Sequence, residues 1–173
     1  QWEPEILYKS CFAGGAMFLQ KDGFVLNFLN RKLLFADHGK KTLPTVSNEK
    51  YLGHAIKVEF VNSTQPQINN YQQGGDYENF FIGNDKTKWA SNVKNYKQIV
   101  YENIYENIDY EVLADGRGIK YNWRVKPNAD VNLINIKYNG ASHIKIDKEG
   151  KFVEVQVNDK IYKPEEWNKQ FEN

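Results

Sequence analysis

Apolar and polar residues alternate in short segments along most of this chain. In HAIKVEFVN, residues 54–62, the side chains of Ile56, Val58 and Phe60 fall on one side of an extended backbone. GIKYNWRV, residues 118–125, alternates in the same way. Because successive side chains of a strand point to opposite faces, this period of two predicts strands with one buried face.

Turn residues between such segments predict hairpins. Three strands are expected within residues 5–30, the second and third joined at Lys21-Asp22-Gly23. The segment IDYEVLADGRG turns at Asp115-Gly116 and leads into GIKYNWRV. LINIKYNG and HIKID predict two further strands, and residues 147–150 predict a turn into a last strand, KFVEVQVN.

The repeat YENIYENI, residues 101–108, fits two structures. Its period of four would place Tyr101 beside Tyr105 on a helix, but the neighbouring segments are strands and Asn is a weak helix former. We therefore expect a strand that ends near Tyr101, a turn at Glu106-Asn107 and a new strand from Ile108.

Polar stretches interrupt the alternation at three places. Residues 37–53, broken by Pro44, predict a variable polar loop or insertion, and the Gln- and Asn-rich residues 62–76 predict a second long connection. Near the end of the chain, residues 164–172 predict a short helix.

Strands that recur every 8 to about 12 residues, with glycine-rich turns and little helix, are typical of antiparallel β proteins. The sequence therefore predicts an all-β fold, a jelly-roll-like antiparallel β-sandwich of about ten or more short strands. Its 173 residues suit a single domain, 1–173.

Charge and cysteine content exclude several classes of partner and site. The formal net charge is +1, which provides no electrostatic basis for binding nucleic acid or an anionic membrane. The longest nearly apolar run, residues 12–19, is too short to span a bilayer, so no membrane insertion is expected. The single cysteine, Cys11, cannot form an intrachain disulfide, and we expect it to be a small buried apolar group.

The sequence does not support a catalytic centre. His38, His54 and His143 are widely spaced, and no nucleophile elbow, phosphate loop or paired-histidine metal motif is present. No catalytic residue, metal ligand or cofactor is therefore predicted. Carboxylates are plentiful, so a glycan hydrolase with an acidic pair is retained as a third functional hypothesis.

An excess of aromatic residues, 14% of the chain, favours sheets and also suits sugar binding. The candidate ligand site lies in NFFIGNDKTKWASN, residues 79–92, and the preceding loop. Its members are one tryptophan, two polar neighbours and two tyrosines: Trp89, Asn84, Asp85, Tyr77 and Tyr71.

Two other interpretations of the same stretch remain open. In the structural one, Trp89 fills the bottom of the sandwich while Asn84 and Asp85 bond to their own turn. In the second, Asp76 and Glu78 join Asn84 and Asp85 in a calcium site, although acidic loops are usually only solvated.

Three blocks of the sequence resemble a known bacterial domain. They are the start QWEPEILYKS, the block FFIGNDKTKWASNV and the block KYNWRVKPNAD. The chain is similar to the Bacteroidetes-type domain of unknown function that precedes SBBP β-propeller repeats, PKD domains or gliding-motility (type IX secretion) C-terminal domains in large surface proteins. The resemblance covers residues 1–29 and 77–147, and it carries no agreed catalytic residues.

This resemblance implies an exported protein, located outside the cell or on the outer membrane, with other modules of the same large protein as partners. Our first hypothesis is a non-catalytic module with an architectural, adhesion or partner-docking role. The alternative is a carbohydrate-binding domain that uses exposed Trp and Tyr side chains, with glycan as its partner.

Overall fold

The computed structural model describes residues 3–12, 14–29, 53–81, 83–114, 118–146, 148, 153–157 and 160–162. The predicted turn at Asp115-Gly116, the predicted helix at 164–172 and all of the predicted loop except Gly53 lie outside these residues.

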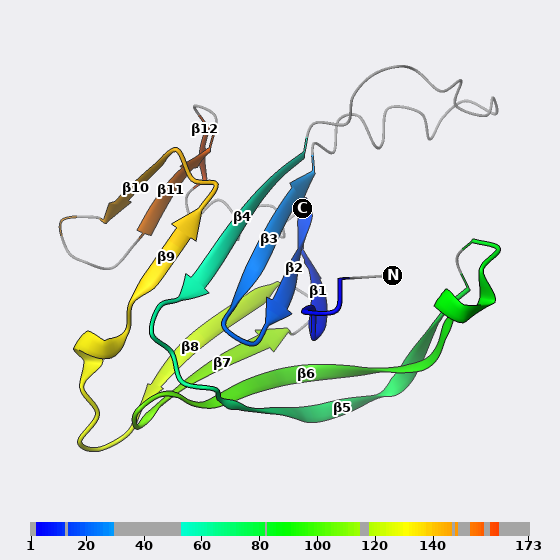
Figure 1. The fold of residues 1–173 in the computed structure, drawn as a ribbon, viewed down its shortest axis with the longest axis horizontal. Helices are drawn as coiled ribbons and strands as arrows, with labels where there is room; N and C mark the ends of the chain where they lie inside the picture. Colours follow the sequence, from blue (N-terminus) through cyan, green and yellow to red (C-terminus); the bar gives the residue numbers. More distant parts are fainter. Residues whose placement is uncertain are drawn as a thin grey trace.

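The described chain forms antiparallel sheets, and the two larger ones face each other as a sandwich (Figure 1). The first sheet has the order β1-β2-β3-β4-β9. Its strands are β1 (Tyr8–Phe12), β2 (Gly15–Gln20), β3 (Gly23–Leu29), β4 (Gly53–Phe60) and β9 (Ile136–Asn139). The second sheet has the order β5-β6-β7-β8. Its strands are β5 (Gln67–Phe80), β6 (Ala90–Tyr105), β7 (Ile108–Ala114) and β8 (Ile119–Val125).

A smaller sheet follows β9 along the chain. It contains β10 (His143–Ile146), β11 (Val153–Val157) and β12 (Lys160–Tyr162), so the hairpin expected around residues 147–150 is confirmed. Helix in the described part is limited to two single 3₁₀ turns, η1 (Lys86–Lys88) and η2 (Val131–Leu133). The predicted all-β antiparallel sandwich is confirmed.

Connectivity within the sheets is that of a meander, and it differs from the alternation between sheets that defines a jelly roll. Consecutive strands joined by short turns pair with each other, as β2 and β3 do through the expected turn at Lys21-Asp22. The chain passes between the two larger sheets after β4 and again after β8, when β9 returns to pair with β4.

Strand alternation produces the core between the two larger sheets. On β4, Ile56, Val58 and Phe60 are buried as predicted, and they face Tyr110 and its neighbours on β7 and β6. The Tyr110 ring lies 4.8 Å from the ring of Phe60 between centroids. The core is therefore rich in aromatic contacts across the two layers.

The YENIYENI repeat is a strand that contains a bulge. The turn at Glu106-Asn107 and the strand from Ile108 are as predicted, but β6 continues four residues beyond the expected end, to Tyr105. Asn103 has a φ of 51°, and the β6–β7 register shifts between Tyr101 and Tyr105. Between these pairs, four residue steps on β6 oppose two on β7, so β6 carries two extra residues there, and the consecutive residues Ile104 and Tyr105 are both buried.

Two further sequence predictions were wrong. Residues 67–76 are part of β5, where a connection was expected, because β6 supplies a long pairing partner for a segment without an apolar face. Cys11 is exposed, because it lies on the outward side of the edge strand β1.

Close packing at Gly23 makes the β2–β3 turn sensitive to substitution. A Cβ atom there would lie 2.0 Å from the Val58 carbonyl oxygen. We expect Gly23→Ala to lower the free energy of unfolding by about 1–3 kcal/mol, because the backbone of β3 or β4 must move. Chemical denaturation measures this change. Gly75→Ala is the matched control, since nothing lies within 4 Å of its added Cβ; an equal loss in both variants would contradict the steric explanation.

Candidate functional site

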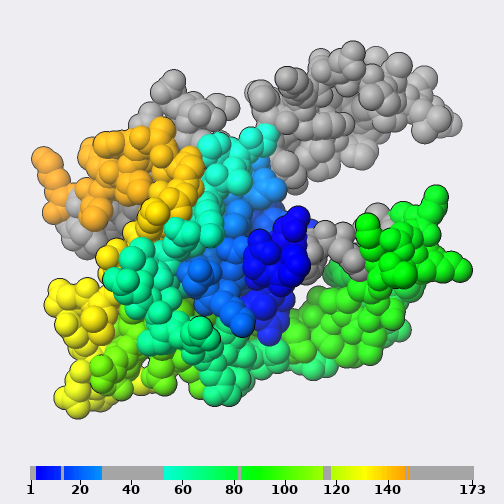
Figure 2. Space-filling model, viewed as in Figure 1, coloured from blue at the N-terminus to red at the C-terminus, as the bar shows by residue number. Residues whose placement is uncertain are grey.

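The β5–β6 hairpin extends well beyond the first sheet and forms an arm, defined here as residues 71–81 and 83–98 (Figure 1). In Figure 2 its green end stands away from the blue and cyan strands of the first sheet. Four large side chains on it are exposed: Tyr71 at its start, and Tyr77 by 57%, Phe81 by 58% and Trp89 by 37% further along it. Such exposed aromatic groups on a projecting element are typical of binding surfaces.

The root of the arm is fixed to β1 through Tyr8. The Asn70 amide donates a hydrogen bond of 3.0 Å to the Tyr8 hydroxyl. The Tyr8 ring also meets Tyr96 of β6 edge to face, with 6.2 Å between centroids. These contacts hold the base of the arm against β1 of the first sheet.

The loop at the end of the arm is held by its own side chains. Asp85 caps η1, because its carboxylate accepts hydrogen bonds from the Thr87 backbone N–H at 3.1 Å and from the Thr87 hydroxyl at 2.6 Å. The Trp89 indole N–H donates to the Gly83 carbonyl at 3.1 Å. These bonds hold the turn at residues 83–89, and Asp85 has the turn-bonding role of the structural interpretation.

Trp89 itself does not fill the bottom of the sandwich, because it lies at the far end of the arm. Its ring packs against Phe81, with 5.3 Å between centroids. The Lys86 ammonium lies 5.8 Å from the ring centroid, over the indole. A second such pair forms nearby, where the Lys94 ammonium lies 5.5 Å from the Tyr77 centroid.

The structure brings together some of the residues predicted for the ligand site and separates others. Asn84, Asp85 and Trp89 share the end loop, and Tyr77 lies three residues from the end of β5. Tyr71 is also exposed, but it lies nine positions before Phe80 on β5, roughly 25–30 Å along the arm. Phe81, Lys86 and Lys94 were missed, because the sequence does not show which side chains cover the aromatic rings.

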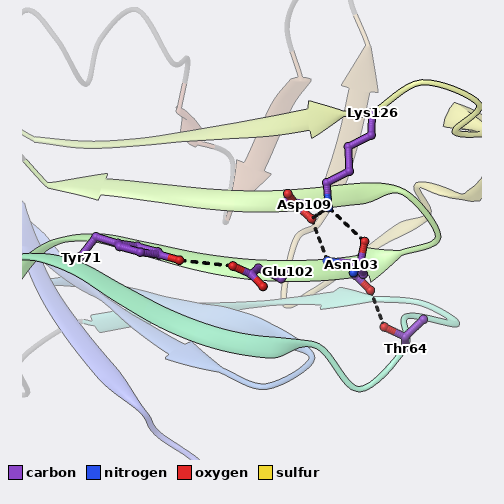
Figure 3. A network of polar contacts seen from close by, with 6 residues as sticks. All are labelled: Thr64, Tyr71, Glu102, Asn103, Asp109 and Lys126. Atoms are coloured by element: carbon purple, nitrogen blue, oxygen red, sulfur yellow. Dashed lines mark hydrogen bonds and ion pairs between the residues drawn. The ribbon is translucent and has the colours of Figure 1, made fainter.

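Tyr71 belongs instead to a polar network on the outer face of the second sheet (Figure 3). Its hydroxyl donates to the Glu102 carboxylate at 3.2 Å. Nearby, Asp109 accepts from the Asn103 backbone N–H at 2.8 Å and from the Lys126 ammonium at 2.7 Å. These bonds hold the β6 bulge against β7.

Glu111 lies two residues further along the same face and is only 5% exposed. Its carboxylate forms an ion pair with Arg124 and accepts hydrogen bonds from Gln98 and Asn122. Burial alone would raise the pKa of Glu111, but the hydrogen bonds from Asn122 and Gln98 and the charge of Arg124 outweigh it and lower the pKa below its usual 4.5.

The pKa of Asp109 is lowered for similar reasons. Burial opposes its ionisation, while the Asn103 N–H and the Lys126 ammonium favour the charged form, so its pKa lies below 3.8. A general acid needs a raised pKa, whereas both of these buried carboxylates have lowered pKa values and occupied oxygens.

Within the described ranges, no group of three or more His, Cys, Asp or Glu side chains is arranged to hold a metal ion. The proposed calcium residues Asp76, Glu78, Asn84 and Asp85 are all exposed in the arm. The described segments also contain no helix that is long and apolar enough to cross a bilayer.

A family model described as "Domain of unknown function (DUF7948)" matches residues 1–163. The chain belongs to this family. No curated protein and no solved structure gives a significant match to it.

Membership of the DUF7948 family agrees with the resemblance expected from the sequence at the level of a domain of unknown function. The match also includes residues 30–53, which lay outside that resemblance. The arm and the outer-face network both fall within the matched range.

Proposed function

We propose that this chain is a non-catalytic docking module of an exported, surface-located or secreted bacterial protein, and that the end of the β5–β6 arm makes the contact. The observation that carries this proposal is the exposure of Tyr77, Phe81 and Trp89 on a hairpin projecting from the sandwich. Aromatic side chains on a preorganised loop provide large contact area at small entropic cost.

Charge on the arm indicates the kind of partner. Lys86 lies over the Trp89 ring and Lys94 over the Tyr77 ring, whereas Asp85 is engaged with its own turn and with Lys88. A partner with acidic and apolar groups on its surface would complement this arrangement. The resemblance in sequence implies other modules of a large Bacteroidetes surface protein as neighbours, and these neighbours are the partners we favour.

The lowered pKa values of Asp109 and Glu111 support a role without catalysis, since both carboxylates serve to hold the second sheet together. Other carboxylates in the described part are largely exposed. The hydrolase hypothesis is therefore the least supported of the three.

We expect the double variant Phe81→Ala, Trp89→Ala to lose at least about tenfold in affinity for the surface and secreted fractions of the host bacterium, because two aromatic anchors are removed. Binding of the labelled chain to these fractions measures the effect. Tyr71→Ala is the matched control, because Tyr71 is similarly exposed (42%) but lies near the root of the arm. Undiminished binding by the double variant would refute the role of the arm.

Carbohydrate binding is the second candidate, and the exposure of Trp89 beside Asn84 and Asp85 favours it. Lys86 and Phe81 cover part of the indole, which leaves less of its face for stacking on a sugar. A glycan array separates the two candidates: binding that Trp89→Ala abolishes and Trp89→Phe retains would establish the glycan function over protein docking.

A further inference from the structure

Among the described strands, β8 is the last strand of the second sheet and pairs on one side only. It pairs with β7 in an unbroken register over all seven residues, and no described strand pairs with its other side. The opposite edge strand, β5, differs from it. There, Gln72 has a φ of 53° and the register shifts twice, which interrupts the row of backbone groups. Irregular edges resist further pairing, whereas a regular edge offers a template for another strand.

The inward side of β8 is incompletely covered. Tyr121 and Val125 are each 50% exposed, although they alternate with polar residues on the side that faces the core. Beside them, a crevice of about 10 Å³ opens between β8 and β9. Its lining is mostly aromatic: Phe24, Val58, Phe60, Tyr110, Tyr121, Trp123, Ile136 and Tyr138.

The Tyr110 hydroxyl provides a second, independent observation at this crevice. Tyr110 is 1% exposed, and its hydroxyl is the one buried side-chain polar atom without a hydrogen-bond partner in the described part of the chain. Buried hydroxyl groups are nearly always hydrogen-bonded in folded proteins. A small polar group entering the crevice would satisfy it.

The outward side of β8 is basic. Lys120 and Arg124 alternate with Asn122, and Lys120 is exposed with no negative partner directly across from it, since it lies opposite Leu113 of β7. Arg124 pairs with Glu111, yet its side chain remains 49% exposed. An added strand with acidic residues on this side would lie opposite two cations.

We propose that β8 accepts an extended segment of another module by strand addition, with small β-branched residues facing the crevice and acidic residues facing outward. The crevice admits only the tip of a small side chain, so a Thr hydroxyl is the group best suited to reach the Tyr110 oxygen. The surface is separate from the end of the arm, and its occupation completes the open side of the sandwich.

The probe is a labelled nine-residue peptide with Val at positions 1, 3, 7 and 9, Thr at position 5 and Glu at the even positions. We expect it to bind about tenfold more tightly than a peptide with Lys in place of Glu, and to protect the backbone amides of residues 119–125 from hydrogen exchange. A peptide with Pro at the two adjacent positions 4 and 5 lacks a backbone donor on whichever edge faces β8 and is expected to bind weakly.

Two variants test the recognition itself. Lys120→Glu reverses the preference between the acidic and basic peptides, whereas Lys21→Glu on the β2–β3 turn leaves it unchanged. Tyr110→Phe removes the advantage of a central Thr over a central Val. The arm variant Phe81→Ala, Trp89→Ala binds the acidic peptide normally, so failure of arm docking and failure of strand addition are distinguishable.

Three results would overturn the proposal. They are equal binding of the proline peptide, protection confined to β5 or the arm, and absence of binding by every peptide. A second copy of this chain could also occupy the edge of β8, and sedimentation of the free chain tests this. A dimer whose interface protects residues 119–125 would assign β8 to the second copy and overturn the proposal.

Discussion

Tyr110→Ala is expected to lower the free energy of unfolding by about 3–5 kcal/mol, the range for removing a large buried aromatic side chain. The centroid of the Tyr110 ring lies 4.8 Å from those of Phe60 and Trp123 and 5.8 Å from that of Tyr101. Loss of this ring therefore opens a cavity in the core between the two larger sheets. Urea denaturation followed by tryptophan fluorescence measures the change.

Matched tyrosine-to-phenylalanine variants separate the ring from the hydroxyl. Tyr110→Phe is expected to keep or raise stability, because it removes a buried hydroxyl that has no partner. Tyr101→Phe is expected to lower stability by about 1 kcal/mol, since the Tyr101 hydroxyl donates to the Gln20 carbonyl at 2.8 Å. A larger loss in Tyr110→Phe than in Tyr101→Phe would mean that the Tyr110 hydroxyl is bonded in solution.

Arg124→Ala is expected to destabilise the chain by about 2–3 kcal/mol, because it leaves the nearly buried carboxylate of Glu111 without its cation. The loss stays below that of a wholly unpaired charge, since Gln98 and Asn122 still donate to Glu111. Lys57→Ala breaks the exposed pair with Glu59 and is the control; we expect a much smaller change.

The two buried carboxylates, Glu111 and Asp109, predict how the stability of the fold changes with pH. Folding lowers the pKa of Glu111 below 4.5 and that of Asp109 below 3.8, so the folded state binds fewer protons than the unfolded state. Their stabilisation is therefore complete above about pH 5 and is lost as the pH falls through the folded-state pKa values. Denaturation midpoints between pH 7 and pH 2 measure it. Glu111→Gln should make stability depend less steeply on pH. If the loss of stability at low pH were the same in this variant, Glu111 would not be its source.

Strands with an apolar face could be predicted from the sequence, whereas strands defined by their neighbours could not. Ile56, Val58 and Phe60 alternate because one face of β4 is buried, and this pattern is visible in a single sequence. Residues 67–76 of β5 are polar on both sides, because an edge strand on a projecting hairpin contacts mainly its partner. Their structure depends on β6, which local patterning does not report.

For the candidate site too, the sequence shows which residues are neighbours along the chain but not which ones the strands bring together or separate. Proximity in sequence correctly placed Trp89 with Asn84 and Asp85 in one loop. It also suggested Tyr71, which extended β5 geometry carries far from the end loop. Pairing of Asp109 with Lys126 and Glu111 with Arg124 requires the β7–β8 register, so no spacing rule could have found the outer-face network.

The order of the strands has a consequence for how the chain folds. Residues 67–125 form β5 to β8 through successive hairpins, so this sheet can assemble from contacts between chain neighbours. The first sheet is complete only when β9 reaches β4, as in the pairing of Tyr138 with Val58. Closing that long loop costs conformational entropy, and pairing between distant segments is slow. We therefore expect β9 to pair with β4 late in folding, after the sheet of β5 to β8 has formed.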